Sequence, residues 1–230
     1  MTPSQVLKLI DKAAADERRK LNFAGQRLTE IPESISKLTK LRYLYFDNNQ
    51  ITEIPEVITH LHNLEFLSIA RNQITEIPRS VLLLRNLTAL NFDCNQITKI
   101  SDSIVNLTHL EWLNLSNNQI TEISHEIGKL TNLKELYLPN NQITEIPKSI
   151  SKLTKLNTLH LEHNQITEIP QELRQLKSLR DLRLTDNPLP IASGIIQEGW
   201  DKRDPRVVLD AYFEFIGAKP RLEPNSTYDS

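Results

Sequence analysis

The sequence has few of the residues on which several common protein classes depend. Its 230 residues include one cysteine, one methionine, five glycines and only 6% aromatic residues. The single cysteine, Cys94, cannot form an intramolecular disulfide, which argues against a disulfide-stapled extracellular chain and favours the cytoplasm. The 27 basic and 29 acidic residues leave a net charge of -2, which gives no long-range attraction for nucleic acid or an anionic membrane.

Long apolar runs are also missing. The opening residues MTPSQVLKLIDKAAADERRK interrupt their apolar positions with Lys8, Asp11 and Lys12, so they predict neither export nor membrane insertion. Composition and the opening residues therefore predict no nucleic-acid partner and no membrane insertion.

Motifs for catalysis are missing as well. Gly194 and Gly199 have the spacing of a phosphate-binding loop, but Trp200 and Asp201 follow them in place of the lysine and hydroxyl residue that bind phosphate and magnesium. An HxxH pair, His160 and His163, falls on opposite faces of an expected strand, unless the turn reorients the second ring. The sequence therefore predicts a non-catalytic protein with no metal and no cofactor.

What the chain does contain is leucine, isoleucine and a repeat. Thirty-five residues are leucine and 24 are isoleucine, and a segment such as LRYLYFDNNQITEIPEVITHLHN recurs every 23 residues. Regular units start at residues 41, 64, 87, 110, 133 and 156, a truncated one at 179 and a degenerate one at Arg18. No insertion or deletion separates Leu41 from Asn187, so the chain holds eight units in one register.

Each unit opens with LxxLxLxxN, in which leucines alternate with polar residues. This alternation predicts one short strand per unit with a single buried face. Strands 23 residues apart must run parallel, and the intervening segment, with Ile54, Ile58 and Leu61 in one unit, must return across the core. The ninth position predicts a structural column of buried amides that bond unpaired backbone groups in the turns: Asn49, Asn72, Asn95, Asn118, Asn141, Asn164 and Asn187.

A second column is acidic. It is interrupted by Lys99 and otherwise contains Glu53, Glu76, Glu122, Glu145 and Glu168. One interpretation is a strip for a basic partner or a cation. The favoured one is a solvated edge that repeat duplication has retained.

The repeat resembles the leucine-rich repeat family, and its 23-residue length with ITEIP is similar to the intracellular type found in bacterial Roco signalling proteins. The resemblance extends to the opening VLKLIDKAAADERRKLNFAGQRLTEIP and to the closing DNPLPI with DPRVVLDAYFEFI. It implies an α/β leucine-rich repeat solenoid, a curved horseshoe with a parallel concave β-sheet and helical caps at both ends.

The expected organisation has four parts. Residues 1–17 form an N-terminal capping helix, opened by a capping box at Thr2 and Gln5, and residues 18–191 form the repeats. Residues 192–219 form a C-terminal cap with a helix near 205–216, whose apolar face closes the last repeat or, alternatively, docks a following domain. Residues 220–230 form a polar tail.

Because the scaffold repeats so closely, partner specificity is expected where the units differ, at the outward positions of the strands. Tyrosine, tryptophan and arginine there are typical anchors of protein interfaces. The alternative is that parallel sheets favour aromatic residues without any partner. The candidate protein-binding residues of the concave face are Tyr43, Tyr45, Phe66, Trp112, Tyr137, His160 and Arg183, with Arg71 and Asp93 at the rim.

The function predicted from sequence is a non-catalytic module that binds a protein partner through its concave face, in intracellular signalling. The alternative is the regulatory repeat domain of a Roco-type GTPase or kinase, whose adjacent GTPase domain lies outside this chain.

Overall fold

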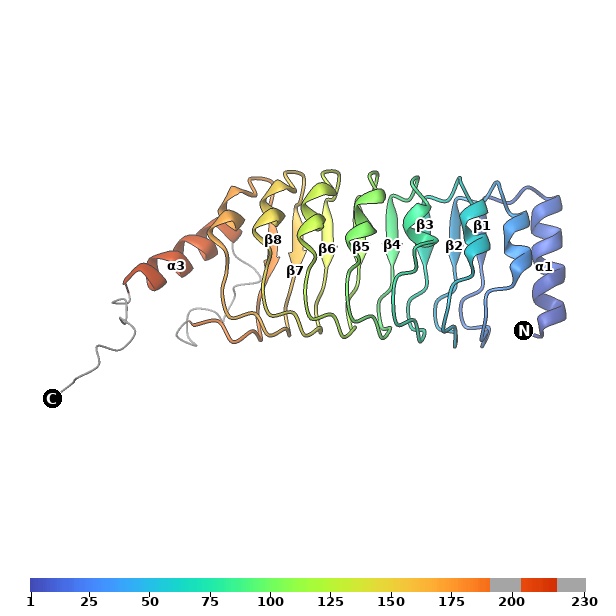
Figure 1. The fold of residues 1–230 in the computed structure, drawn as a ribbon, viewed down its shortest axis with the longest axis horizontal. Coiled ribbons are helices and arrows are strands. Elements are labelled where there is room, and N and C mark those ends of the chain that lie inside the picture. The colour runs from blue at the N-terminus through green and yellow to red at the C-terminus, as the bar shows by residue number, and fades with distance from the viewer. Residues whose placement is uncertain (191–203, 219–230) are drawn as a thin grey trace.

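The computed structural model describes residues 1–190 and 204–218, in which eight short parallel strands form one open sheet in sequential order. The array is elongated, with a helix at each end (Figure 1). The strands are β1 Lys20–Asn22, β2 Tyr43–Tyr45, β3 Phe66–Ser68, β4 Ala89–Asn91, β5 Trp112–Asn114, β6 Glu135–Tyr137, β7 Thr158–His160 and β8 Asp181–Arg183.

The register of the sheet follows the repeat. Leu90 of β4 pairs with Leu113 of β5, which pairs with Leu136 of β6, and the same 23-residue offset relates all eight strands. The central leucine of every strand is buried, while its two neighbours lie on the opposite side. The predicted solenoid with a parallel sheet and one strand per unit is therefore confirmed.

Each returning segment forms a short 3-10 helix on the other side of the core. These helices are η1 Glu33–Lys37, η2 Glu56–His60, η3 Val81–Leu83, η4 Asp102–Asn106, η5 His125–Lys129, η6 Lys148–Lys152 and η7 Gln171–Gln175. Most are preceded by proline, whose restricted φ suits the extended conformation found there. Ser101 and Ser124 replace proline before η4 and η5, and each hydroxyl accepts a backbone hydrogen bond from two residues ahead.

A helix covers the first repeat. In α1, Pro3–Ala15, the side chain of Thr2 accepts a hydrogen bond from the Gln5 amide at 3.3 Å, and the Gln5 side chain accepts one from the Thr2 amide at 2.8 Å. This is the predicted capping box. Val6 and Ile10 are buried against the array.

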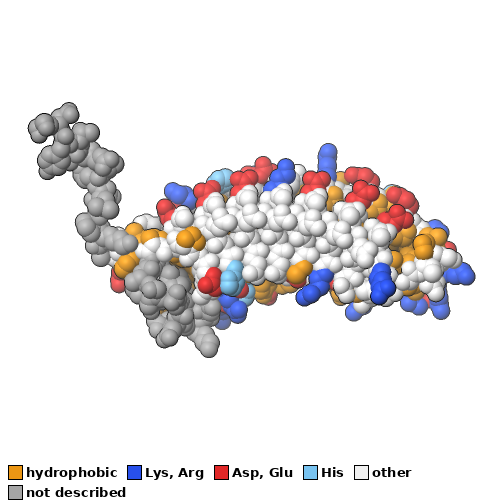
Figure 2. Space-filling view, turned by 90° about the horizontal axis from the view of Figure 1, so that it is seen from below, with side chains coloured by type: hydrophobic (Ala, Val, Ile, Leu, Met, Phe, Trp, Pro, Cys, Tyr) orange, Lys and Arg blue, Asp and Glu red, His pale blue; other side chains and the backbone are white. Residues whose placement is uncertain are grey.

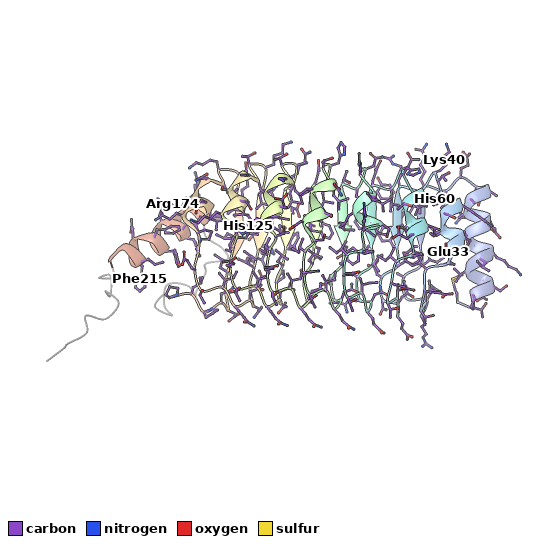
Figure 3. The ribbon with its side chains drawn as sticks, in the orientation of Figure 1. Glu33, Lys40, His60, His125, Arg174 and Phe215 are labelled. Carbon is purple, nitrogen blue, oxygen red and sulfur yellow. The ribbon has the colours of Figure 1, made fainter. Side chains whose placement is uncertain are left out.

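At the other end, α3, Pro205–Ala218, extends two residues beyond the predicted helix. Val208, Leu209 and Tyr212 are buried, and the Tyr212 hydroxyl accepts a hydrogen bond from the Ile169 amide at 3.1 Å. Arg174 of η7 lies beside α3 and pairs with Asp210 at 2.5 Å (Figure 3). Most of the expected stretch before this helix and the whole tail, residues 220–230, lie outside the described residues.

Candidate protein-binding face

The sheet presents two outward side chains per strand, because the central leucine of each three-residue strand faces the core. We use the name sheet face for these outward side chains of β1–β8 and for the residues that flank them. Tyr43, Tyr45, Phe66, Trp112, Tyr137, His160 and Arg183 all lie on the strands themselves, as the repeat register predicts.

Five rings form a continuous series across the sheet face, which we call the aromatic ladder: Tyr45, Phe66, Trp112, Tyr137 and His160. Successive ring centroids are 5.0, 6.5, 5.9 and 4.9 Å apart. Phe66 and Trp112 lie two strands apart, with only the small side chain of Ala89 between them in the same column. The rings therefore support one another over most of the sheet, and Tyr45, Phe66, Trp112 and Tyr137 remain partly exposed.

The C-terminal end of the ladder is held by two carboxylates. The Tyr137 hydroxyl donates to Glu135 at 2.7 Å. Burial, the hydrogen bond to Glu135 and the charges of Glu135 and Asp181 raise the pKa of Tyr137 to about 12, against a smaller opposite effect of a Trp112 hydrogen bond. Glu135 and Asp181 therefore keep the Tyr137 phenol protonated at this end of the ladder.

His160 occupies a different environment from the one expected of an interface anchor. Its ring meets Tyr137 edge-on, its Nε2 lies 2.8 Å from Asp181 Oδ2, and only 8% of the residue is exposed. Asp181 also lies 3.4 Å from Arg183 Nε. His160 thus supports Tyr137 and offers little surface of its own, because Tyr137 and the side chains of β8 cover it.

The N-terminal end of the ladder carries cations. Lys20 Nζ lies 5.1 Å from the centre of the Tyr45 ring. Tyr43 lies beside the ladder, where the Arg42 guanidinium sits 5.9 Å from its ring centre and also pairs with Glu65 at 2.5 Å. The hydrogen bond to Glu65 raises the pKa of Arg42, so this cation is held in place by a carboxylate.

Arg71 and Asp93 lie where the strands end, as rim residues. Arg71 is exposed and has a φ of 56°, in the left-handed region. Its amide donates to the Asp93 carbonyl at 2.8 Å, and the Asp93 side chain accepts from Asn117 Nδ2 at 2.7 Å. The two residues are brought together through the backbone, since no ion pair between their side chains occurs in the described part of the chain.

A small polar network beside the ladder was not singled out from the sequence. Asp47 accepts from the hydroxyl of Ser68 and from the Ala70 amide, and Asn91 Nδ2 donates to Ser68 Oγ at 3.0 Å. Ser68 is almost fully buried, at 2% exposure. The signal for this network in the sequence is the run of short polar side chains at the last residue of β3, β4 and β5: Ser68, Asn91 and Asn114.

The asparagine column is used entirely by the scaffold. In the middle of the array, Asn118 Nδ2 donates to the carbonyl oxygens of Leu115 and Phe92 at 3.1 and 3.0 Å, and its Oδ1 accepts from the Ile97 amide at 2.9 Å. Because its amide group is buried and bonded at both ends, it has little capacity left for a ligand. The same pattern recurs at Asn49, Asn72, Asn95, Asn141, Asn164 and Asn187.

The described residues contain no group of three or more His, Cys, Asp and Glu side chains placed to share a metal ion. His163, like His160, lies beside an aspartate, with its Nδ1 3.3 Å from Asp186.

Carboxylates spaced along one edge of the molecule are visible in Figure 2, with basic side chains among them. Within residues 1–190 and 204–218, no helix has the length and apolar character needed to cross a bilayer.

Comparison with known families decides the classification of this array. The profile described as "Leucine-rich repeat region" matches residues 21–111 and 94–195, which together include most of the chain. The chain belongs to the leucine-rich repeat family. Domains of this family are generally non-catalytic scaffolds that present an extended binding surface.

Three solved structures illustrate the similarity. A plant peptide hormone receptor, RGFR1, in complex with RGF2 is 32% identical, with a TM-score of 0.63 over 70% of this chain and 27% of its own. The ectodomain of the Arabidopsis thaliana receptor kinase GASSHO1/SCHENGEN3, in complex with CASPARIAN STRIP INTEGRITY FACTOR 2, is 31% identical, with a TM-score of 0.71 over 79% of this chain and 22% of its own. InlJ from Listeria monocytogenes is 28% identical, with a TM-score of 0.67 over 80% of this chain and 38% of its own.

The chain thus spans about a quarter of the length of the two plant receptors. A comparison with curated proteins finds no significant match.

Proposed function

We propose that this chain is a non-catalytic module that binds a protein partner through the sheet face. The observation that carries the proposal is the aromatic ladder, which presents partly exposed rings held in place by one another. Large aromatic side chains at a rigid surface bind with a low entropic cost and dominate many protein interfaces. Eight strands spaced by about 4.8 Å make a strip long enough for an interface of roughly 800 Å² per partner.

The relatives support the same class of partner. Both plant receptors are described in complex with a named ligand, and one is described as a peptide hormone receptor. By analogy, we infer that the outward side chains of β2–β7 of this chain also contact a polypeptide partner.

The proposed setting is intracellular signalling in the cytoplasm. It is supported by the single half-buried thiol of Cys94 and by the resemblance of the 23-residue repeat to the Roco type. Burial raises the pKa of the Cys94 thiol, which keeps the reactive thiolate scarce at neutral pH.

A second candidate function is the regulatory repeat domain of a Roco-type GTPase or kinase. It is favoured by α3, in which Val207 remains 56% exposed and could pack against a neighbouring domain. The genomic sequence after codon 230 tests this candidate. A GxxxxGK loop downstream supports it, and an immediate stop codon contradicts it.

The binding proposal is tested by capture of partners from the native lysate. The variant Tyr45→Ala, Trp112→Ala, Tyr137→Ala removes three rings of the ladder, and circular dichroism checks that it remains folded. A matched control, Glu53→Ala, Glu122→Ala, Glu145→Ala, changes the acidic edge instead. We expect a protein retained by the unmodified chain and by the control but lost from the ladder variant. Equal recovery by the ladder variant would contradict the proposal.

A further inference from the structure

Trp112, Glu135 and Tyr137 form a compact group on the sheet face. Trp112 and Glu135 are direct register partners on β5 and β6, and Tyr137 lies on the same side of β6 as Glu135. The Trp112 and Tyr137 rings are 5.9 Å apart and inclined by 50°, and the Tyr137 hydroxyl donates to Glu135 at 2.7 Å. All three side chains are partly exposed. A single group of a binding partner can therefore contact two aromatic rings and a carboxylate at once.

Glu135 forms no ion pair with any residue that the structure describes. The neighbouring cations are already engaged, because Lys134 Nζ lies 2.7 Å from Glu111 and Arg183 Nε lies 3.4 Å from Asp181. Asp181 is a second carboxylate near the Tyr137 phenol, and the charges of Glu135 and Asp181 both raise the pKa of Tyr137. Asp181 is paired with Arg183, so the charge of the group that no cation of the described chain neutralises directly is that of Glu135.

The same combination occurs at the other end of the sheet face with its cation present. The Tyr43 hydroxyl lies 3.4 Å from Glu65, and Arg42 Nε donates to Glu65 at 2.7 Å. The guanidinium of Arg42 also sits 5.9 Å from the Tyr43 ring centre. At that position the glutamate therefore pairs with an arginine of the same chain, and this arginine also lies over the ring of the tyrosine.

We propose that the protein partner supplies an arginine side chain to Trp112, Glu135 and Tyr137, in the role that Arg42 has beside Tyr43 and Glu65. This inference rests on the proposed function of the sheet face. Arginine fits better than lysine, because its planar guanidinium stacks on an aromatic ring while its N–H groups bond a carboxylate in a fixed geometry. Charge complementarity favours the same partner, since no cation of the described chain pairs with Glu135.

The test is a titration of the folded chain with the peptide acetyl-Gly-Gly-Arg-Gly-Gly-amide at physiological ionic strength. The NMR signal of the Trp112 indole N–H, assigned with a Trp112→Phe variant, reports binding at the site. A peptide with citrulline in place of arginine has nearly the same shape without the charge. We expect saturable shifts with the arginine peptide and an affinity about fivefold lower with citrulline, as for the loss of a charge-assisted hydrogen bond.

Two variants with the same change of charge localise the effect. Glu135→Gln should weaken binding of the arginine peptide by about fivefold. Glu145→Gln, on the acidic edge away from the ladder, should leave the affinity unchanged. Equal affinity for the arginine and citrulline peptides, an unchanged affinity in Glu135→Gln, or no saturable shift of the Trp112 signal would each overturn the proposal.

Lysate capture separates this inference from the proposed function. If Glu135→Gln retains the partner as well as the unmodified chain while the triple ladder variant loses it, the sheet face binds protein but the arginine assignment is wrong. If the triple ladder variant retains the partner, the proposed function itself fails.

Discussion

At the scale of single residues, each asparagine of the turn column both donates hydrogen bonds to backbone carbonyl oxygens and accepts one from a backbone amide. Asn118 combines a donor group for two carbonyl oxygens with an acceptor for the Ile97 amide. Leucine would fill the space but leave the Ile97 amide without its acceptor, and aspartate would lack the donor. The carbonyl oxygens of Leu115 and Phe92 would each keep a second donor, from the neighbouring asparagines of the column. The identity of this residue is therefore set by hydrogen bonding rather than by volume.

We expect Asn118→Ala to lower the free energy of unfolding by about 1 to 3 kcal/mol, because it leaves the buried Ile97 amide without its acceptor. Urea denaturation measures the change. The neighbouring exposed residue offers a control, since Gln119→Ala should change stability by less than about 0.5 kcal/mol. Similar stabilities for the two variants would show that the column is not structural.

The phenol of Tyr137 makes stability depend on pH. Its pKa is about 12 in the folded chain, above the ordinary value of 10, so the folded state holds the proton more tightly than the unfolded state does. The stabilisation is complete below the ordinary pKa and is lost as the pH rises toward 12. We therefore expect urea midpoints to fall between pH 10 and 11.5, and to fall less steeply in Tyr137→Phe. An equal slope in the variant would contradict the assigned environment.

At the scale of elements, the returning 3-10 helices pack closely enough to require glycine at one position. Gly128 of η5 is buried, and a Cβ atom placed on it would lie 2.3 Å from the Ser149 carbonyl oxygen in η6. The Ser149 oxygen belongs to the backbone, and a Cβ atom is held rigidly by the backbone of residue 128, so no side-chain rotation relieves the clash. Glycine is required at Gly128 because two backbones approach each other there.

Gly128→Ala should therefore destabilise the chain by about 1 to 3 kcal/mol, as overpacking does elsewhere. Gly217→Ala in α3 is the matched control, because nothing lies within 4 Å of its Cβ position. Alanine also favours helix, so this variant should be as stable as the unmodified chain or more so. Thermal denaturation distinguishes the two, and a neutral Gly128→Ala would show that η5 and η6 can separate at little cost.

At the scale of the whole molecule, stability is distributed along the array, because each repeat packs against its neighbours and the two ends are covered by α1 and α3. Tyr212 ties α3 to the last complete repeat through the Ile169 amide. A defect in a central repeat therefore weakens two interfaces, whereas a defect in a cap weakens one.

Leu136→Ala in β6 tests this organisation. Leu136 is fully buried between Leu113 and Leu159, and truncation of a buried leucine costs about 2 to 5 kcal/mol. We expect a lower midpoint of urea denaturation with little change in the circular dichroism of the folded state. A nearly neutral effect would contradict the register of the sheet.

The repeat sequence by itself determined the strand register, the buried leucines and isoleucines and the asparagine column, because a period of 23 residues without gaps leaves only one way to stack the units. The helices at the two ends were predicted from signals outside the repeats, such as the capping box at Thr2 and Gln5. The repeat sequence also placed seven candidate side chains on the sheet face. Only the tertiary structure decided which of them act together. Trp112 reaches Phe66 over Ala89, His160 is covered by Tyr137 and the side chains of β8, and Glu135 remains without a cation while Glu65 has one. Alternation within one strand assigns a side chain to a face, but the rotamers and contacts of that side chain depend on residues one, two or more repeats away.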